Sequence, residues 1–318
     1  MKTVRHLETI IHITPLGIRC VDISTQSLIT DGLRITATET NRASKPKPAS
    51  VTSSGVYALH NLPGLHDFEY QLDTQPGPNP LVTSPPIGKE FAIQLEDLQG
   101  RFLPWGVMLT LPRKEIFKAF LFSAPSRSPV PGLAVIRGEL KDATRPEVNG
   151  RLQPAAHARI EAEYDVTSPP TVYVGLADAR GQFALFLPFP NALQAPAGAL
   201  ITSPNTPGRK TLSELRWPVT LSFFYEPDKQ KFICTRPDGQ IEIVQGQPDG
   251  FTDGPRPGWR CVPDLSSLLK DQSAAQIYRP ALSPPATNLQ TEIEFGKEVV
   301  VRAAPSNSSD DTSIWIAP

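Results

Sequence analysis

The sequence predicts an all-β protein with two tandem antiparallel β-sandwich domains and a Pro/Gly-rich, partly extended C-terminal region. Two observations favour this fold class. Apolar and polar residues alternate in short runs, which is the period-two pattern of strands with one buried face. The chain also carries 35 prolines and 21 glycines among 318 residues, and these residues separate the runs and favour turns between them. No long 3.6-residue period competes, so we expect little helix.

The first set of predicted strands lies before residue 115. The start of the chain has an apolar stretch broken by His, Thr and Pro and lacks a signal-peptide cleavage site, so we interpret it as a first strand. Residues 101–111 predict a strand, a sharp bend at Pro104-Trp105-Gly106 and a second strand. The clearest alternation covers residues 33–38, 68–72 and 91–96.

A second set of strand candidates follows residue 115. They cover residues 134–140, 158–163, 171–176, 182–187 and 218–225. The best helix candidate is residues 263–270, where Asp264 is a suitable N-cap and Leu265, Leu268 and Leu269 share a face.

The two sets share one short motif, Asp-x-x-Gly-x-Phe. It begins at Asp97 and again at Asp178, 81 residues later. The aspartate can accept backbone N–H groups, the glycine tolerates positive φ, and the phenylalanine starts the next strand facing inward. The repetition suggests a repeated β-domain with the motif as a hairpin turn.

We place the domains at residues 1–115 and 116–230, followed by a Pro/Gly-rich extension at 231–318 with a short helix and a few strands. Segments rich in Pro, Gly, Ser, Thr and Asn are predicted as loops, linkers or docking arms. Among these we expect residues 191–209 and 249–278 to act as arms that become ordered only against neighbouring subunits.

Composition excludes several classes of protein. A net charge of −1 gives no basic surface for nucleic acid, and no window approaches the ~18 apolar residues of a membrane span. Cys20, Cys234 and Cys261 have no metal-knuckle spacing. We favour three buried, reduced cysteines in a cytoplasmic protein, with a Cys234–Cys261 bridge as the alternative.

No catalytic, cofactor or metal site is predicted. His60, His66 and Asp67 flank the turn at residues 61–65, and a metal there would need another strong ligand, so we interpret them as polar flanks of a hairpin. The serines at positions 123, 126 and 128 lie among prolines rather than at a nucleophile elbow.

The four tryptophans are the candidate interaction residues: Trp105, Trp217, Trp259 and Trp315. A carbohydrate-binding sandwich gathers exposed aromatic rings on one face. These four are scattered along the chain, so we favour corner packing or burial against a neighbouring subunit.

Three segments resemble the carboxypeptidase regulatory-like domain family. They are Gly132 to Leu140, residues 153–162, and Gly175 to Leu185 with its Asp-x-x-Gly-x-Phe turn. The resemblance covers about 100 residues and implies a seven-stranded, transthyretin-like sandwich. It implies no enzymatic activity, because this domain is the accessory neighbour of the peptidase and holds no zinc site.

Residues 121–140, together with 61–65 and 100–105, are similar to accessory proteins of phage-tail-like contractile injection systems. That resemblance implies a non-enzymatic structural component at the baseplate of a large cytoplasmic particle. Its partners would be baseplate, tube or spike subunits, with no nucleic acid and no membrane insertion. The alternatives are a ligand- or carbohydrate-binding β-sandwich module and, third, a hydrolase, for which His60 or His66 is the first residue to substitute.

Overall fold

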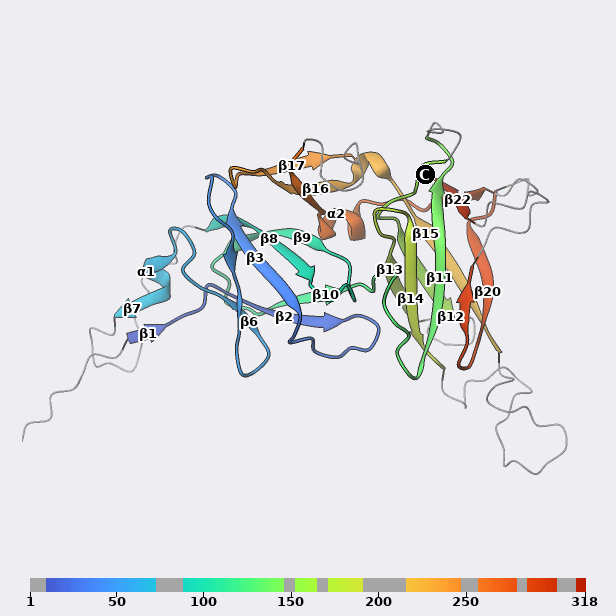
Figure 1. The fold of residues 1–318 in the computed structure, drawn as a ribbon, viewed down its shortest axis with the longest axis horizontal. Coiled ribbons are helices and arrows are strands. Elements are labelled where there is room, and N and C mark those ends of the chain that lie inside the picture. The colour runs from blue at the N-terminus through green and yellow to red at the C-terminus, as the bar shows by residue number, and fades with distance from the viewer. Residues whose placement is uncertain are drawn as a thin grey trace, which may run out of the picture.

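The computed structural model describes residues 10–72, 88–145, 152–164, 171–190, 216–246, 257–278, 285–301 and 313–318. Within these residues nearly all regular structure is strand, arranged as two β-sandwiches, a small three-stranded sheet and a two-stranded sheet (Figure 1). The all-β fold predicted from the alternation is therefore confirmed. None of the described helices has the length and apolar composition needed to cross a membrane.

The first sandwich consists of two four-stranded sheets. One has the order β10 (Phe117–Leu121), β2 (Leu16–Asp22), β6 (Tyr57–Leu59), β5 (Ser50–Val51), and the other β4 (Lys47–Pro48), β3 (Leu33–Glu39), β8 (Lys89–Asp97), β9 (Trp105–Leu111). Alternate residues of β3, β8 and β9 face a common core, as their period-two pattern predicts. β10 pairs with β2 in parallel, so this sandwich is not purely antiparallel.

The strand predicted at residues 68–72 is partly wrong. A short helix, α1 (His66–Glu69), precedes β7 (Tyr70–Leu72), which pairs with β1 (Ile10–His12). The fully buried Glu69 carboxylate accepts the backbone N–H of Asn61 at 2.7 Å and that of Leu62 at 3.0 Å. These bonds hold the chain in a turn that local alternation does not reveal.

The second sandwich is built from strands far apart in the sequence. One sheet has the order β14 (Gln182–Pro188), β11 (Leu133–Asp142), β22 (Ile314–Ala317), β19 (Gln276–Tyr278), with β21 (Glu298–Val300) also paired to β11. The other has the order β13 (Val172–Leu176), β12 (Arg159–Tyr164), β15 (Arg216–Phe224), β20 (Asn288–Glu294).

Four of these strands, β19 to β22, fall within residues 231–318, which we predicted from the sequence to be a separate extension. β21 and β22 pair with β11, β20 pairs with β15 and β19 pairs with β22, and all four contribute side chains to the same core. Residues 231–318 are therefore not a separate extension, because they supply strands to the second sandwich. β21 and β22 both pair with β11 in parallel, which differs from the predicted antiparallel arrangement.

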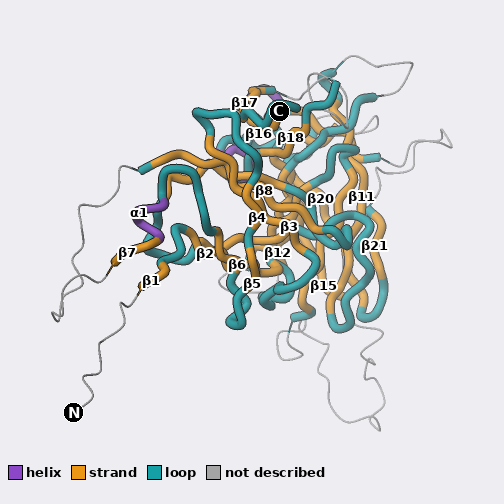
Figure 2. Tube along the Cα trace, turned by 60° about the vertical axis from the view of Figure 1, so that its left-hand side comes forward, coloured by secondary structure: helices purple, strands orange, loops and turns teal. Residues whose placement is uncertain are grey.

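The remaining sheet, here called the inserted sheet, has the order β17 (Ile241–Gln245), β16 (Lys231–Thr235), β18 (Arg260–Pro263). It follows a short 3-10 helix, η3 (Pro227–Lys229), and leads into α2 (Leu265–Lys270). Figures 1 and 2 place it alongside β8 of the first sandwich, and Ile233 and Ile241 pack there against Ala92. The chain thus leaves the second sandwich, covers the first and returns.

The predicted helix is confirmed as α2. Asp264 is its N-cap, and its side chain accepts the backbone N–H of Ser267 at 3.2 Å. Leu265 and Leu268 are buried, and Leu269 is partly buried beside them. The prediction of a docking arm at residues 249–278 is wrong for 257–278, which hold β18, α2 and β19. Residues 249–256 and 191–209 lie outside the described residues.

The prediction of three reduced cysteines is also wrong, and the alternative, a Cys234–Cys261 bridge, is the arrangement found. Cys234 on β16 and Cys261 on β18 form a disulfide, while Cys20 is free and buried. The two residues lie directly opposite each other in the sheet register. A spacing of 27 residues carried no signal for this pairing, which arises because β16 and β18 are neighbours.

Candidate functional site: the joint between the two sandwiches

Three of the four predicted interaction residues are buried in the chain's own cores. Trp105 is 1% exposed in the first sandwich, Trp217 is 2% exposed in the second, and Trp259 is 6% exposed on the inserted sheet. The Trp259 ring packs beside Phe232 and Cys234. Trp315, on β22, is half-buried. The corner-packing alternative therefore describes the first three tryptophans.

The histidines at the 61–65 turn form no recognisable site. Among the described residues there is no group of three His, Cys, Asp or Glu side chains able to hold a metal ion. His66 and Asp67 begin α1, and the turn is organised by Glu69 instead.

The serines of the linker lie at the joint between the two sandwiches. Ser123 is buried, and its hydroxyl accepts a hydrogen bond from the Arg127 guanidinium at 2.8 Å. The Ser126 hydroxyl donates to the carbonyl of Gly100 at 3.3 Å. Ser128 is exposed. These residues therefore position a linker.

Arg127 is the centre of this joint. Its guanidinium lies 4.8 Å from the ring of Phe102 in the first sandwich and 4.9 Å from the ring of Phe186 in the second. It also donates to the Asp22 carboxylate at 2.7 Å, and the two side chains are only 10% and 1% exposed. A charged group packed between two rings and paired with a buried carboxylate couples both sandwiches to the linker.

The electrostatics of Asp22 agree with this geometry. Burial acts to raise the pKa of its carboxyl. Hydrogen bonds from Arg127, the Thr25 hydroxyl and the backbone N–H of Ser24 outweigh that effect, so the pKa is lowered. The carboxylate is therefore charged at neutral pH and available to hold Arg127.

A second arginine fastens the linker to the second sandwich. Arg137, on β11, donates to the carbonyl of Arg127 at 2.6 Å and to that of Pro125, and it pairs with Glu298 at 2.7 Å. Val130 of the linker also packs on an apolar cluster that includes Phe186. The linker therefore lies against the outer face of the β11–β14 sheet.

The inserted sheet provides a further attachment. The Gln94 side-chain amide on β8 donates to the Thr235 hydroxyl at 3.0 Å and accepts from it at 3.3 Å. Gly106 permits close approach, because an added Cβ would lie 2.9 Å from Ile233 and 3.0 Å from Val262. At the junction, Leu176 of β13 and the α2 leucines join the core of the first sandwich.

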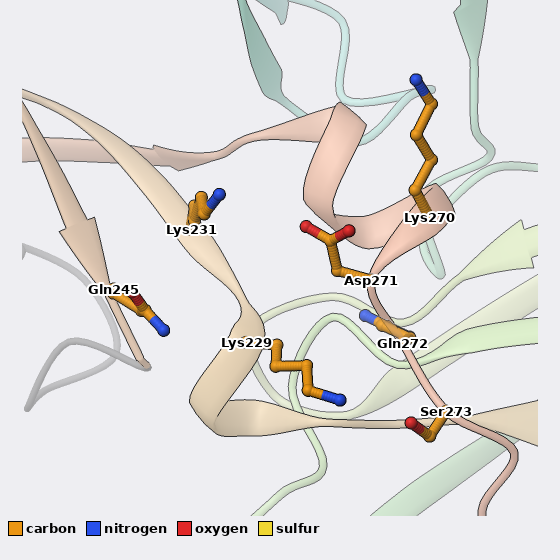
Figure 3. Close-up of a pocket in the computed structure, with 7 residues that line it drawn as sticks. All are labelled: Lys229, Lys231, Gln245, Lys270, Asp271, Gln272 and Ser273. Carbon is orange, nitrogen blue, oxygen red and sulfur yellow. The ribbon is translucent and has the colours of Figure 1, made fainter.

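A polar hollow of about 480 Å³ opens beside α2 (Figure 3). Its lining residues are Lys229, Lys231, Gln245, Lys270, Asp271, Gln272 and Ser273. Lys229 pairs with Glu226 at 3.5 Å, and Figure 3 shows the Lys270 side chain extending away from those of Lys229 and Ser273. The ammonium groups of Lys229 and Lys270 therefore do not converge on one point.

The residues that build the joint were not identified from the sequence. Arg127 lies in a Pro-rich stretch that predicts only a linker, and Gln94 occupies an ordinary polar position of an alternating strand. Both act through contacts with residues distant in the sequence. Their local pattern therefore carried no signal, apart from the presence of a long cation beside prolines.

Comparison with known proteins assigns no family. No family model matches the chain, and no curated protein matches it. One solved structure, the tetra-tandem repeat in the extending region of a large adhesion protein, aligns over 88% of this chain and 75% of that one. At 10% identity and a TM-score of 0.14, that likeness carries no argument about fold or function.

Proposed function

We propose that this chain is a non-enzymatic structural subunit that serves as a rigid two-sandwich spacer in a phage-tail-like contractile injection particle, at its baseplate. The observation that carries the structural role is the joint. Arg127 lies between rings of both sandwiches and pairs with Asp22. The inserted sheet adds a second attachment at a separate place.

Two attachments at different points resist both bending and twisting between the sandwiches. A flexible tether needs neither a buried arginine nor a sheet laid across the neighbouring domain. A subunit that transmits force during contraction has to keep its two ends in fixed relation, and this is the property that the joint supplies. The assignment to a contractile particle rests on the resemblance of residues 121–140, 61–65 and 100–105 to accessory proteins of contractile injection systems.

Co-sedimentation tests the particle. The chain is tagged after Pro318 in its native host, large particles are sedimented from lysate, and the proteins travelling with the tag are identified. Sheath and tube proteins should co-sediment with it. If the chain stays in the supernatant as a monomer, the particle assignment fails. Binding of that monomer to a glycan array would then favour the carbohydrate-binding module.

A matched pair of variants tests the rigid joint. Arg127→Ala removes the central cation, whereas Arg34→Ala removes an exposed pair with Glu96 on the first sandwich. We expect Arg127→Ala to reduce incorporation into particles by about tenfold while both sandwiches stay folded, since a buried charged pair contributes more than an exposed one. Equal incorporation of the two variants would contradict a role for joint rigidity.

A further inference from the structure

The Cys234–Cys261 disulfide lies in the inserted sheet, the element that joins the two sandwiches. We propose that this disulfide is a redox-controlled latch: when oxidised it holds β18 and α2 against the first sandwich, and when reduced it lets them loosen. The inference concerns the joint itself and goes beyond the proposed role in a particle, because it holds for whatever assembly the chain enters.

The hydrogen bonds that hold β18 are few. β18 lies at the edge of the inserted sheet and pairs only with β16 there, over four residues. The next residue along, Asp264, adds one further bond, from its backbone N–H to the carbonyl of Lys231 at 2.8 Å. A short edge strand opens easily, so the covalent link between Cys234 and Cys261 adds substantially to its attachment.

Loosening β18 affects the joint directly. β18 runs through Asp264 into α2, whose Leu265 and Leu268 are buried in the core of the first sandwich. Asp264 also forms a parallel bridge with Gly106 of β9. α2 has only six residues, too few to be stable by itself, so its position depends on the chain on either side.

The positions of the three cysteines confine the reaction to this pair. Cys261 is half-buried, whereas Cys234 is fully buried behind it. Cys20 is fully buried in the first sandwich, and burial raises the pKa of its thiol to about 12. Cys20 therefore has almost no thiolate at neutral pH and does not exchange with the pair.

The oxidation requires a small-molecule disulfide of the oxidised-glutathione class. The Cys261 thiolate attacks one of its sulfurs, forming a mixed disulfide and releasing one small thiolate. The Cys234 thiolate then attacks the Cys261 sulfur and releases the second. Two protein thiols thereby lose two electrons, the small disulfide gains them, and the two protons end on the released thiols.

Hydrogen exchange on the full chain tests the latch. The protein is oxidised with oxidised glutathione, and amide exchange is followed by mass spectrometry with and without dithiothreitol. Closing a loop over a separation of 27 residues predicts that amides of β18 and α2 exchange of the order of a hundredfold faster after reduction. Amides of β11 and β12, in the second sandwich, should keep their rates.

Thiol titration in denaturant accompanies each sample. One thiol, that of Cys20, should titrate in the oxidised protein and three in the reduced protein. Three thiols in the oxidised sample would overturn the proposal. Unchanged exchange of β18 and α2 upon reduction would overturn it as well.

Two variants sharpen the result. Cys20→Ala should respond to dithiothreitol as the unmodified chain does. The double variant Cys234→Ala, Cys261→Ala should exchange rapidly in β18 and α2 under both conditions. A response of the double variant to dithiothreitol would contradict the proposal. If the double variant does not fold, the oxidised and reduced forms of the unmodified chain decide the question by themselves.

Discussion

The two copies of the Asp-x-x-Gly-x-Phe motif share their local geometry. Asp97 accepts the backbone N–H of Gln99 at 3.3 Å and that of Arg101 at 2.6 Å. Asp178 accepts those of Arg180 at 2.8 Å and Gln182 at 2.9 Å. Both glycines have positive φ, and both phenylalanines are buried. The prediction of a shared turn device is confirmed at this level.

The chain takes different paths after the two turns. After the second copy it continues as β14, which pairs with β11 in the sheet opposite to that of β13. This copy is a corner between sheets, not the predicted hairpin. After the first copy, Phe102 bridges to Ser123 just past β10 of the opposite sheet, yet β9 returns to pair with β8.

The two copies differ at the seventh residue after the aspartate, which is Pro104 in the first copy. Residues 101–103 already begin to pair with the opposite sheet, since Leu103 donates to the carbonyl of Phe122 at 2.9 Å. Pro104 follows, and from Trp105 the chain pairs with β8 instead. The corresponding residue of the second copy is Leu185, which pairs with Ile136. The motif thus makes the corner, and the residues that follow decide which sheet the next strand joins.

The copies also differ in charge. At the fourth position after the aspartate stands Arg101 in the first copy and Gln182 in the second. Burial acts to raise both pKa values, but hydrogen bonds from the Arg101 side chain and from backbone amides lower that of Asp97 overall. Asp178 has only backbone donors and the charge of Arg180 against burial, and its pKa is raised.

Alanine at the two glycines should give the largest contrast. An added Cβ at Gly181 would lie 2.2 Å from the carbonyl oxygen of Leu140, whereas at Gly100 nothing lies within 4 Å. Gly181→Ala should lower the free energy of unfolding by about 3 kcal/mol, from steric overlap plus positive φ. Gly100→Ala should cost about 1 kcal/mol, from φ alone. Urea denaturation measures both, and equal losses would refute the difference in packing.

Asparagine at the two aspartates should give a smaller contrast. Asp97→Asn removes a buried carboxylate paired with Arg101 at 3.2 Å, and should cost about 2 kcal/mol at pH 7. Asp178→Asn should cost under about 1 kcal/mol, because the charged form is not favoured there and the amide oxygen still accepts. A larger loss at Asp178 would show that backbone bonds, rather than the cation, dominate both turns.

The same variants should separate in their pH dependence. The lowered pKa of Asp97 gives stability that is present above its ordinary value of 3.8 and is lost as pH falls through the folded-state pKa. The raised pKa of Asp178 works in the opposite sense, so the chain gains stability relative to Asp178→Asn as pH falls from 7 toward 4. Unfolding at stepped pH values should give difference curves of opposite slope; curves of the same slope would contradict the assignment.

The smallest effect should come from transferring the cation. Gln182 is exposed, so Gln182→Arg introduces into the second copy the residue found in the first without burying it. We expect a gain below about 1 kcal/mol and a lower pKa for Asp178, measured by NMR titration of the carboxyl. An unchanged pKa would mean that Arg101 owes its effect to its second partner, Asp31, at 3.4 Å.

Local pattern was sufficient to predict β3, β8, β9, β11 to β15 and α2, because period-two alternation and an N-cap are properties of neighbouring residues. It was not sufficient for pairings between distant residues. β22 pairs with β11 across about 170 residues, in parallel, and nothing in its four residues indicates a partner. Glu69 fitted a polar strand position, although its carboxylate is buried beneath a turn. The role of Arg127 likewise depends on its contacts with Phe102 and Phe186, and its neighbours in the sequence do not indicate those contacts.

The placement of β22 has a consequence for biosynthesis. Every strand of the first sandwich has been translated by Leu121, whereas β22, a central strand of its sheet, spans residues 314–317. During synthesis the strands of the first sandwich can therefore pair with one another before β22, the neighbour of β11, has been translated. A ribosome that stalls between the end of β14 and the start of β22 would hold a chain with every strand of the first sandwich made and residues 140–142 of β11 still without their partner strand, the kind of intermediate that chaperones bind.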